Sequence, residues 1–460
     1  MRQPQVLPSR HALVLLLLAL PLAALGGVAG VGQPISAQGT PLLREVSVGQ
    51  SAQGRSISAL RVGNGPRKLV IVGDTHGGPE ANTYQLTLEL IEHFRANPQE
   101  VPAEVSLYLI DSINPDGLAL GWRFDSAGVD LNRNMNTNLD ACSENDWSTT
   151  VQGARGLVSE TGGPYPDSQV ESRLVRSFLL DAAGAIFIHS NAGLVFPAFC
   201  EHPPSLAMAQ AYAEAAGYVY SRFWPRYMIT GGMHDWAGSL GIAAITPELV
   251  SGESSEFAEN LAGVRAVLAR PAELLPLPAD RLERGVSVPA IIWRYWKANG
   301  GAAVFGMPLE PAQPTADGMV QAFERARLAW QPAQAGTPYV VQPRPLGAEA
   351  ADSLSFGGAA ARARADPTST ARFFPETGHS LKEAFLNYWE REGGLAVFGY
   401  PLSEEFDARA FDGQRRTLQY FERAVLAYYP EDTSVRPEPL GRWATQRELT
   451  RASWTANQIR

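Results

Sequence analysis

Two histidines of this chain stand where strand-like runs of apolar residues end. His76 follows "KLVIVGDT" (68–75), and His189 lies near the end of "GAIFIHS" (184–190). A carboxylate, Glu80, comes four residues after the first histidine. Open α/β sheets place ligands at the carboxyl ends of their strands, and two imidazoles with one carboxylate can hold zinc with one position left for water. The set predicts a catalytic zinc site, whereas a lone histidine at such a place would favour a structural role.

A hydrolytic zinc site also needs a base that delivers water and a cation that holds the substrate. Glu248 follows "AAITP" near the end of another apolar run, where a buried acid is costly unless it faces a cleft. The segment "NPDGLALGWRFDSAGVDLNRN" (114–134) supplies Arg123 and Arg133, whose guanidinium groups suit a carboxylate or a developing oxyanion. A plain polar surface loop is the alternative interpretation of this segment.

Strand-like apolar runs alternate with helical patterns from about residue 41 to 270. The alternation predicts an α/β domain whose mixed, largely parallel sheet is flanked by helices. We expect strands at 68–73, 105–111, 184–190 and 242–250, and helices at 80–97, 168–184 and 255–270. The Pro-rich segment 271–280 ends this catalytic domain, which we place at 41–275.

The C-terminal third of the chain contains an internal repeat. Its copies pair "IIWRYWKANGGAAVFGMPLEP" (291–311) with "AFLNYWEREGGLAVFGYPLSE" (384–404), and "VQAFERARLAWQP" (320–332) with "LQYFERAVLAYYP" (418–430). We expect two small repeat modules, at 285–347 and 372–445, whose aromatic residues form small cores rather than a binding surface. The segment between them, 348–371, is rich in Ala, Ser and Gly and is expected to be a flexible linker.

Residues 1–37 have the layout of a secretory signal. Arg2 and Arg10 precede a long apolar run, and we expect cleavage after Ala37. An uncleaved membrane anchor is the alternative, because the run approaches spanning length. The mature chain is then expected to be secreted or extracytoplasmic, with association with the cell envelope as one option.

The bulk composition narrows the classes of partner. The formal net charge is −9, and 45% of the residues are hydrophobic and 18% charged. An acidic, globular chain of this kind does not suit nucleic acid or an anionic lipid surface, so we expect no nucleic-acid partner and, once the signal is removed, no membrane partner. Cys142 and Cys200 are the two cysteines, and an oxidising compartment would permit a bridge that the sequence leaves open.

Five motifs in order resemble the zinc carboxypeptidase family, α/β hydrolases that remove C-terminal residues. They lie within about residues 44–270: "VGQSAQGRSISALRVG", "THGGPEANT", "NPDG" with "GVDLNRN", "IFIHS" and "GGMHDWAGSLGIAAITPEL". Any one of them is a weak signal, but five in this order are specific. The bacterial branch that includes γ-D-glutamyl-diaminopimelate peptidases is the most similar part of the family.

The resemblance implies the chemistry of the site. His76, Glu80 and His189 would bind one Zn²⁺ per chain. Glu248 would act as the general base and then as the acid that protonates the leaving amine. Arg123 would stabilise the oxyanion together with the metal.

The resemblance also implies how a substrate is held. Asn132 and Arg133 would bind the terminal carboxylate of a peptide, which makes the enzyme an exopeptidase. Tyr227 falls where the family keeps a mobile tyrosine that closes over the substrate. His234, just before Asp235, stands where the family sets side-chain preference, and a histidine there suits an acidic or polar residue better than a basic one.

One departure concerns the spacing of the first two ligands. The commonest family pattern is His-x-x-Glu, whereas "HGGPE" (76–80) has one extra residue, so Glu80 is the least secure of the three. Gly77 and Gly78 are expected to absorb that residue by letting the chain turn. The same glycines would place Glu80 in the first turn of a helix, where its charge suits the helix dipole.

Three functions are compatible with these observations. The first is a secreted zinc metallocarboxypeptidase that cuts a C-terminal amide bond of peptides, with cell-wall stem peptides as a candidate substrate. The second is a zinc-dependent acylase or amidase of the aspartoacylase kind, against which Arg133 and Tyr227 argue. The third is an envelope- or wall-binding protein with an inactive peptidase-like domain. Its repeats, which vaguely resemble the LGxP repeats of actinobacterial envelope proteins, would bind cell wall or a surface glycan.

Overall fold

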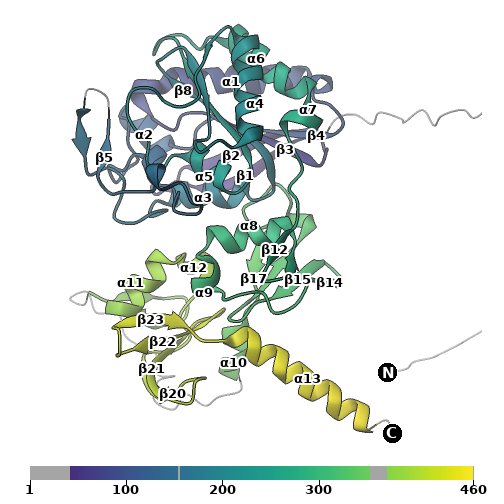
Figure 1. Ribbon diagram of the computed structural model, residues 1–460. Helices are drawn as coiled ribbons and strands as arrows, with labels where there is room; N and C mark the ends of the chain where they lie inside the picture. The colour runs from purple at the N-terminus through teal and green to yellow at the C-terminus, as the bar shows by residue number, and fades with distance from the viewer. Residues whose placement is uncertain (1–41, 154–155, 353–369, 459–460) are drawn as a thin grey trace, which may run out of the picture. The chain divides into compact units, whose positions relative to one another are not determined.

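The computed structural model describes residues 42–153, 156–352 and 370–458, with side chains up to residue 450 (Figure 1). The expected secretory signal, 1–37, lies outside the described residues. Within the described part of the chain, no helix combines the length and the apolar character needed to cross a membrane.

A nine-stranded mixed sheet forms the centre of the N-terminal domain. Its strands follow the order β1-β2-β4-β3-β7-β11-β9-β10, and β8 pairs with β11. The central pairs β4/β3, β3/β7 and β7/β11 are parallel, whereas β1/β2, β2/β4 and β11/β9 are antiparallel. The predicted mixed, largely parallel sheet is therefore confirmed. The strands are β1 Leu43–Gln50, β2 Ser56–Val62, β3 Arg67–Val72, β4 Val105–Ile110, β7 Ala182–Phe187, β8 His189–Ser190, β9 Leu194–Pro197, β10 Val219–Tyr220 and β11 Ala243–Leu249.

Helices cover both faces of this sheet, because the central strands are apolar on both sides. Leu69 and Ile71 of β3 share a core with helices α1, α4 and α6, and the alternate residues Val70 and Val72 share the opposite core with α3 and α5 (Figure 1). The helices are α1 Ala81–Ala96, α2 Pro115–Leu120, α3 Val170–Leu179, α4 Pro203–Ala216, α5 Met233–Ser239, α6 Phe257–Ala269 and α7 Pro271–Leu274. The helix expected to run to residue 184 ends at Leu179, because the following residues pair with β3 as strand β7.

The two repeat segments carry the same order of elements. Each has a two-stranded hairpin, a helix pair, a four-stranded antiparallel sheet and a closing helix. The first comprises β12 Arg281–Glu283, β13 Val286–Val288, α8 Ala290–Ala298, α9 Gly301–Val304, β14 Gln313–Thr315, β15 Gly318–Ala322, β16 Arg327–Trp330, β17 Val341–Pro343 and α10 Leu346–Asp352. The second comprises β18 Arg372–Phe374, β19 His379–Leu381, α11 Glu383–Arg391, α12 Gly394–Phe398, β20 Phe406–Arg409, β21 Arg415–Tyr420, β22 Val425–Tyr429, β23 Ser434–Pro437 and α13 Leu440–Gln458.

Each closing helix packs against the other segment, which explains why "PLG" occurs twice, at 345–347 and 439–441. A Cβ added to Gly347 in α10 would lie 2.0 Å from the carbonyl oxygen of Phe421 in the second segment. A Cβ added to Gly441 in α13 would lie 1.7 Å from the carbonyl oxygen of Phe323 in the first. Only glycine permits such an approach of two backbones. The expected flexible linker is therefore wrong for 348–352, which are helical and packed, and most of its remainder lies outside the described residues.

A buried arginine connects helix α8 to the N-terminal domain. Arg294 is 2% exposed, and its guanidinium group donates to the backbone oxygens of Leu180, Ala182, Leu240 and Gly241 at 2.7–3.1 Å. Arginine suits this place because its planar group offers five donors. The first repeat segment is thus anchored to the domain that precedes it.

Replacing this anchor is expected to destabilise the protein. Arg294→Leu leaves four buried carbonyl oxygens without their donor, which should lower the free energy of unfolding by about 3 kcal/mol. The corresponding residue of the second copy, Asn387, is exposed, so Asn387→Leu should change it by less than about 0.5 kcal/mol. Urea unfolding followed by circular dichroism measures both. Equal effects of the two substitutions would contradict the anchoring role.

Candidate metal and catalytic site

His76 and His189 meet at one edge of the sheet, although 113 residues separate them in the chain. Their Nδ1 atoms lie 3.1 Å apart, and their ring centroids 4.6 Å apart. Glu80 contacts both rings, with Oε1 2.8 Å from His76 Nδ1 and Oε2 3.0 Å from His189 Nδ1. The structure therefore brings together the three side chains that were expected to bind metal.

The register of the parallel strands accounts for this meeting. Strands β3 and β7 pair with Val72 opposite Phe187, so both strands end at the same edge of the sheet. His189 begins β8, two residues after β7 ends, and His76 follows β3 by four residues. Glu80 comes directly before helix α1 and lies beside both rings.

Gly77 and Gly78 have a second role that was not expected from the sequence, a close approach of neighbouring backbone. Neither has a positive φ, so a left-handed turn is not their purpose. A Cβ on Gly77 would lie 2.4 Å from backbone atoms of Gly117 and Trp122, and one on Gly78 would lie 2.2 Å from the backbone oxygen of Gly121. Because they lack a Cβ, the glycines let this neighbouring backbone pack against the segment that precedes Glu80. Glu80 is the last residue of the short 3-10 helix η1 (Gly78–Glu80).

The donor set fits a zinc ion. All three side chains are buried, and their donor atoms lie within 4.8 Å of one another. Bonds of about 2.0–2.1 Å place the donors of a tetrahedral zinc roughly 3.3 Å apart, close to the spacing seen between these atoms. Burial alone would raise the pKa of Glu80, but His76 and His189 hold it well below its usual range. The carboxylate is therefore ionised, as a metal ligand must be.

Asp130 lies on the outer side of this group, a place that was not predicted from the sequence. Its Oδ1 is 2.9 Å from His76 Nε2, the ring nitrogen that does not face Glu80. Arg123 donates to Asp130 Oδ2 and to Glu80 Oε1, both at 3.0 Å. A carboxylate in such a position fixes the tautomer and orientation of a ligand histidine. The signal was available in "GVDLNRN", where Asp130 comes two residues before Asn132.

Glu248 stands beside the group near the end of β11. In the parallel pairing of β8 with β11 it lies opposite His189, and it is 9% exposed. Burial, followed by the negative charge of Glu80, raises the pKa of Glu248 to about 8. A carboxyl group that can take up and release a proton near neutral pH thus lies next to the candidate metal ligands.

Asn132 and Arg133 belong to the 3-10 helix η3 (Leu131–Arg133) and are buried. The Nδ2 of Asn132 is 3.3 Å from His189 Nε2, and its Oδ1 accepts from the backbone N–H of Met233 at 2.9 Å. Arg133 donates to the carbonyl oxygen of Asn132 at 2.7 Å, and its guanidinium carbon lies 5.7 Å from the ring centre of Tyr227. Asn132 is therefore engaged within the fold, whereas Arg133 and Tyr227 face each other.

A family model described as zinc carboxypeptidase matches residues 35–265, which is half of the chain. The chain belongs to the zinc carboxypeptidase family. Peptidases of this family depend on zinc and act on peptides. The matched residues include every side chain of the site described above.

Solved structures and one curated protein are also similar to parts of this chain. Carboxypeptidase A from Helicoverpa armigera is 21% identical, with 50% of this chain and 70% of that chain covered and a TM-score of 0.41. Murein-tripeptide amidase MpaA from Escherichia coli O157 is 21% identical, with 53% and 98% covered and a TM-score of 0.38. Bacteriocin BCN5 of Clostridium perfringens is 36% identical over 105 residues, which span 20% of this chain and 12% of that protein.

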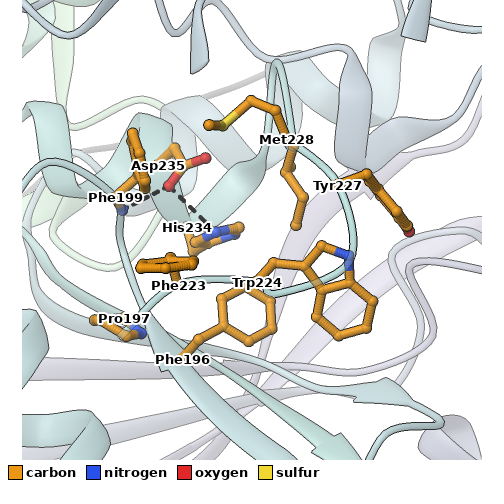
Figure 2. A pocket seen from close by; sticks show the side chains of 10 residues that line it. Phe196, Pro197, Phe199, Phe223, Trp224, Tyr227, Met228, His234 and Asp235 are labelled. Carbon is orange, nitrogen blue, oxygen red and sulfur yellow. Dashed lines mark hydrogen bonds and ion pairs between the residues drawn. The ribbon is translucent and has the colours of Figure 1, made fainter. Parts of the chain in front are cut away.

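Next to Tyr227, the zinc carboxypeptidase domain has a hollow of about 30 Å³ that is partly open to solvent (Figure 2). His234 and Asp235, from the first turn of α5, lie at its inner side. Aromatic and apolar side chains, which the sequence did not single out, form much of the remaining wall, among them Phe196, Phe223, Trp224 and Met228. His234 thus lies where a residue that sets side-chain preference was expected.

Cys142 and Cys200 form a disulfide whose Cα atoms are 6.2 Å apart. The bridge joins the segment before Asn145 to the segment that follows β9. Both segments hold Asp235, because the backbone N–H of Phe199 donates to its Oδ1 at 2.8 Å and the side chain of Asn145 also hydrogen-bonds it. The disulfide therefore fixes two loops of the zinc carboxypeptidase domain against the inner side of the hollow.

Proposed function

We propose that the chain is an exported zinc metallocarboxypeptidase that binds one zinc ion and hydrolyses the C-terminal amide bond of peptides. The observation that carries this proposal is the meeting of two Nδ1 atoms, 3.1 Å apart, with the Glu80 carboxylate and with Glu248 on the adjacent strand. Membership of a family of zinc-dependent peptidases supports it. Export rests on the layout of residues 1–37 alone.

In this proposal His76, Glu80 and His189 hold the metal. When bound, a zinc ion polarises the substrate carbonyl and makes water more acidic. Asp130 accepts a hydrogen bond from the Nε2–H of His76, which leaves the lone pair of Nδ1 available to the metal. Arg123 is engaged with Asp130 and Glu80, and its partly exposed guanidinium group provides positive charge beside the place where the oxyanion develops.

Glu248 moves the proton. As a carboxylate it takes a proton from the attacking water, and as a carboxylic acid it passes that proton to the nitrogen of the leaving residue. The raised pKa of Glu248 suits both roles, because the group can gain and lose a proton near neutral pH. Its place opposite His189 puts it on the same edge of the sheet as the metal ligands.

Arg133 is proposed to hold the terminal carboxylate, with Tyr227 closing over it. Arg133→Met should lower kcat/KM for peptides with a free C-terminus by roughly 50-fold, mainly through KM, because a charge-assisted hydrogen-bonded pair is lost. Arg133→Lys keeps the charge but not the planar fork and should lose less. Steady-state kinetics with free and C-terminally amidated peptides measures both effects. Equal cleavage of free and amidated peptides by the unaltered protein would contradict this role.

The proposed function is tested by the products that the protein releases. Peptides and muropeptides are incubated with it, with and without a chelator, and the products are identified by mass spectrometry. Release of a single C-terminal residue that stops on chelation supports the proposal, and release from muropeptides would extend it to cell-wall stem peptides. Cleavage of N-acyl amino acids but not of peptides would favour an acylase, and full activity without zinc would refute the proposal.

Binding of cell wall or a surface glycan through the repeat segments stays a prediction. The large aromatic residues Trp296, Phe323, Trp389 and Phe421 are buried, so they offer no exposed stacking surface. Because Arg294 anchors the first segment, co-sedimentation with cell walls should use the whole chain, with the chelated protein as a comparison. A chain that binds walls but cleaves nothing would favour an inactive, wall-binding protein.

A further inference from the structure

A cleft of about 510 Å³, partly open to solvent, is lined by the zinc carboxypeptidase domain and by both repeat segments. Helix α3 of the domain forms one wall, α8 and β17 of the first segment form a second, and α11 and α12 of the second segment form a third. Its volume is that of sites that bind small organic ligands. None of the residues that line it belongs to the candidate metal and catalytic site.

Arginines dominate the charge of this cleft, since four of them line it. Arg176 pairs with the Asp167 carboxylate at 2.7 Å, and the exposed Arg372 lies 3.4 Å from Glu390. The other two arginines form no ion pair with a carboxylate of the described residues. The lining therefore carries two positive charges that no carboxylate offsets.

The two unpaired arginines are Arg173 and Arg423, and each keeps donors available. Arg173 donates through Nη1 to two backbone oxygens of the loop before α3, at 2.6 and 2.9 Å. Arg423 donates through Nη1 to two backbone oxygens of α12, at 2.7 and 2.9 Å. In the part of the chain that the structure describes, no hydrogen bond uses the Nε or Nη2 of either side chain. This edge of a guanidinium group can bind a carboxylate or phosphate through two parallel hydrogen bonds.

The guanidinium groups lie close enough to act on one another and on Tyr295 in the cleft wall. Burial, followed by the charge of Arg176, lowers the pKa of Arg173. Burial raises the pKa of Tyr295 to about 12, against the opposing charges of Arg423 and Arg176. Positive charges from the domain and from the second repeat segment thus converge on one place, where a bound anion would offset them.

Apolar and aromatic side chains form much of the remaining wall. Val170 and Leu174 come from the domain, and Tyr339 and Val341 come from the first repeat segment. Tyr339 is 57% exposed, so its ring is accessible to a ligand. An apolar group that packs against these side chains is removed from water, which favours binding.

We propose that the cleft binds an amphipathic anion, whose carboxylate or phosphate group is held by Arg173 and Arg423 and whose apolar body packs against the neighbouring wall. A cation would be repelled by the two unpaired arginines, and a neutral ligand would leave their charge without a counterpart. The formal net charge of the chain is −9, so the positive charge is a property of this cleft and not of the chain as a whole. The repeat segments then complete a ligand site for which the domain supplies only one wall.

Three naphthalene probes of similar size test the site: naphthalene-2-carboxylate, 2-naphthyl phosphate and the uncharged 2-naphthamide. Calorimetry with the unaltered chain should show at least one of the anions binding more than about tenfold more tightly than the amide, because charge-assisted hydrogen bonds form. The anion that binds more tightly identifies the head group. Equal binding of all three probes, or no binding of either anion, would overturn the inference.

The internal repeat supplies a matched control for the role of Arg423. Its counterpart in the first segment, Arg325, also donates through Nη1 to two backbone oxygens, both at 2.8 Å, but does not line the cleft. Arg423→Met and Arg325→Met should therefore lower the melting temperature to a similar extent. Only Arg423→Met should weaken binding of the anion, by more than about tenfold. Similar affinities of the two variants for the anion would contradict the role of Arg423.

Arg173→Gln tests the guanidinium group that the domain supplies. Glutamine can still donate to the backbone oxygens but carries no charge, so binding of the anion should weaken by about tenfold while the affinity for 2-naphthamide stays the same. An unchanged affinity for the anion would count against the inference. Binding should not change when a chelator is present, because no candidate metal ligand lines the cleft. Failure of these binding experiments therefore leaves the proposed function standing, and absence of peptidase activity leaves this inference standing.

Discussion

Replacing Glu248 with glutamine is expected to lower kcat by about 10³-fold while the chain stays folded and keeps its zinc. Glutamine has nearly the same shape as glutamate but cannot take a proton from water. The side chain lies opposite His189 on the neighbouring strand and is not part of the group proposed to hold the metal. Single-turnover kinetics, zinc content by atomic absorption and circular dichroism measure the three quantities.

The pH dependence of activity is a second test of the role of Glu248 as a base. Burial and the charge of Glu80 raise the pKa of Glu248 to about 8 from 4.5, and a base must be deprotonated to act. Activity should therefore rise with pH through this pKa and fall below it. The positive charge of a bound zinc ion would move the acid limb below 8, and Glu248→Gln should abolish the limb.

A neighbouring carboxylate provides the control for Glu248→Gln. Glu253 is exposed in the loop that follows β11, so Glu253→Gln should leave kcat and the pH profile unchanged. If Glu248→Gln retained the kcat of the unaltered protein, Glu248 would not be the base. If it lost zinc, Glu248 would be a metal ligand and the roles of the two glutamates would need to be exchanged.

The meeting of the ligands could be predicted from the sequence because it follows from sheet geometry. His76 and His189 each come after a run of residues that is buried on both sides, and parallel strands end at a common edge. Glu248 could be placed by the same reasoning, since its strand is the next one in the sheet. The alternation of strands and helices along the sequence was likewise enough to predict the α/β fold class, because such alternation produces a largely parallel sheet flanked by helices.

Other features depend on which backbones meet, and local patterns do not contain that information. The need for Gly77 and Gly78 arises from a segment about forty residues further on, which passes within 2.4 Å of their absent Cβ atoms. Residues 348–352 have a linker-like composition but become helical because α10 packs against the other repeat segment. The aromatic walls of the hollow come from separate parts of the chain, so no motif marked them.

The disulfide and the role of Asp130 could be predicted only in part, because the sequence offered the residues but not their contacts. Two cysteines in a chain with a secretory layout permit a bridge, but only the fold brings Cys142 and Cys200 within 6.2 Å between their Cα atoms. Asp130 lay inside a motif that had been noticed, and its role became evident once its oxygen was found 2.9 Å from His76.

Glu80→Gln is expected to remove the metal, and with it the activity. Glu80 places one oxygen near each histidine and is ionised, so it is the charged member of the ligand group. A neutral amide in its place leaves two imidazoles, which should weaken zinc binding by about 10³-fold or more and reduce turnover in proportion to the zinc lost. Zinc titration with a competing chelator, followed by kinetics at each occupancy, measures both.

Two further substitutions show which carboxylate is the ligand despite the extra residue between His76 and Glu80. Glu248→Gln should keep zinc and lose turnover, the reverse order of effects from Glu80→Gln. Asp130→Asn, which alters a neighbour of His76 and not a ligand, should weaken zinc binding by only about 10- to 100-fold. If Asp130→Asn released the metal while Glu80→Gln kept it, Asp130 would be the third ligand. His76 would then bind zinc through Nε2, the nitrogen that lies 2.9 Å from Asp130.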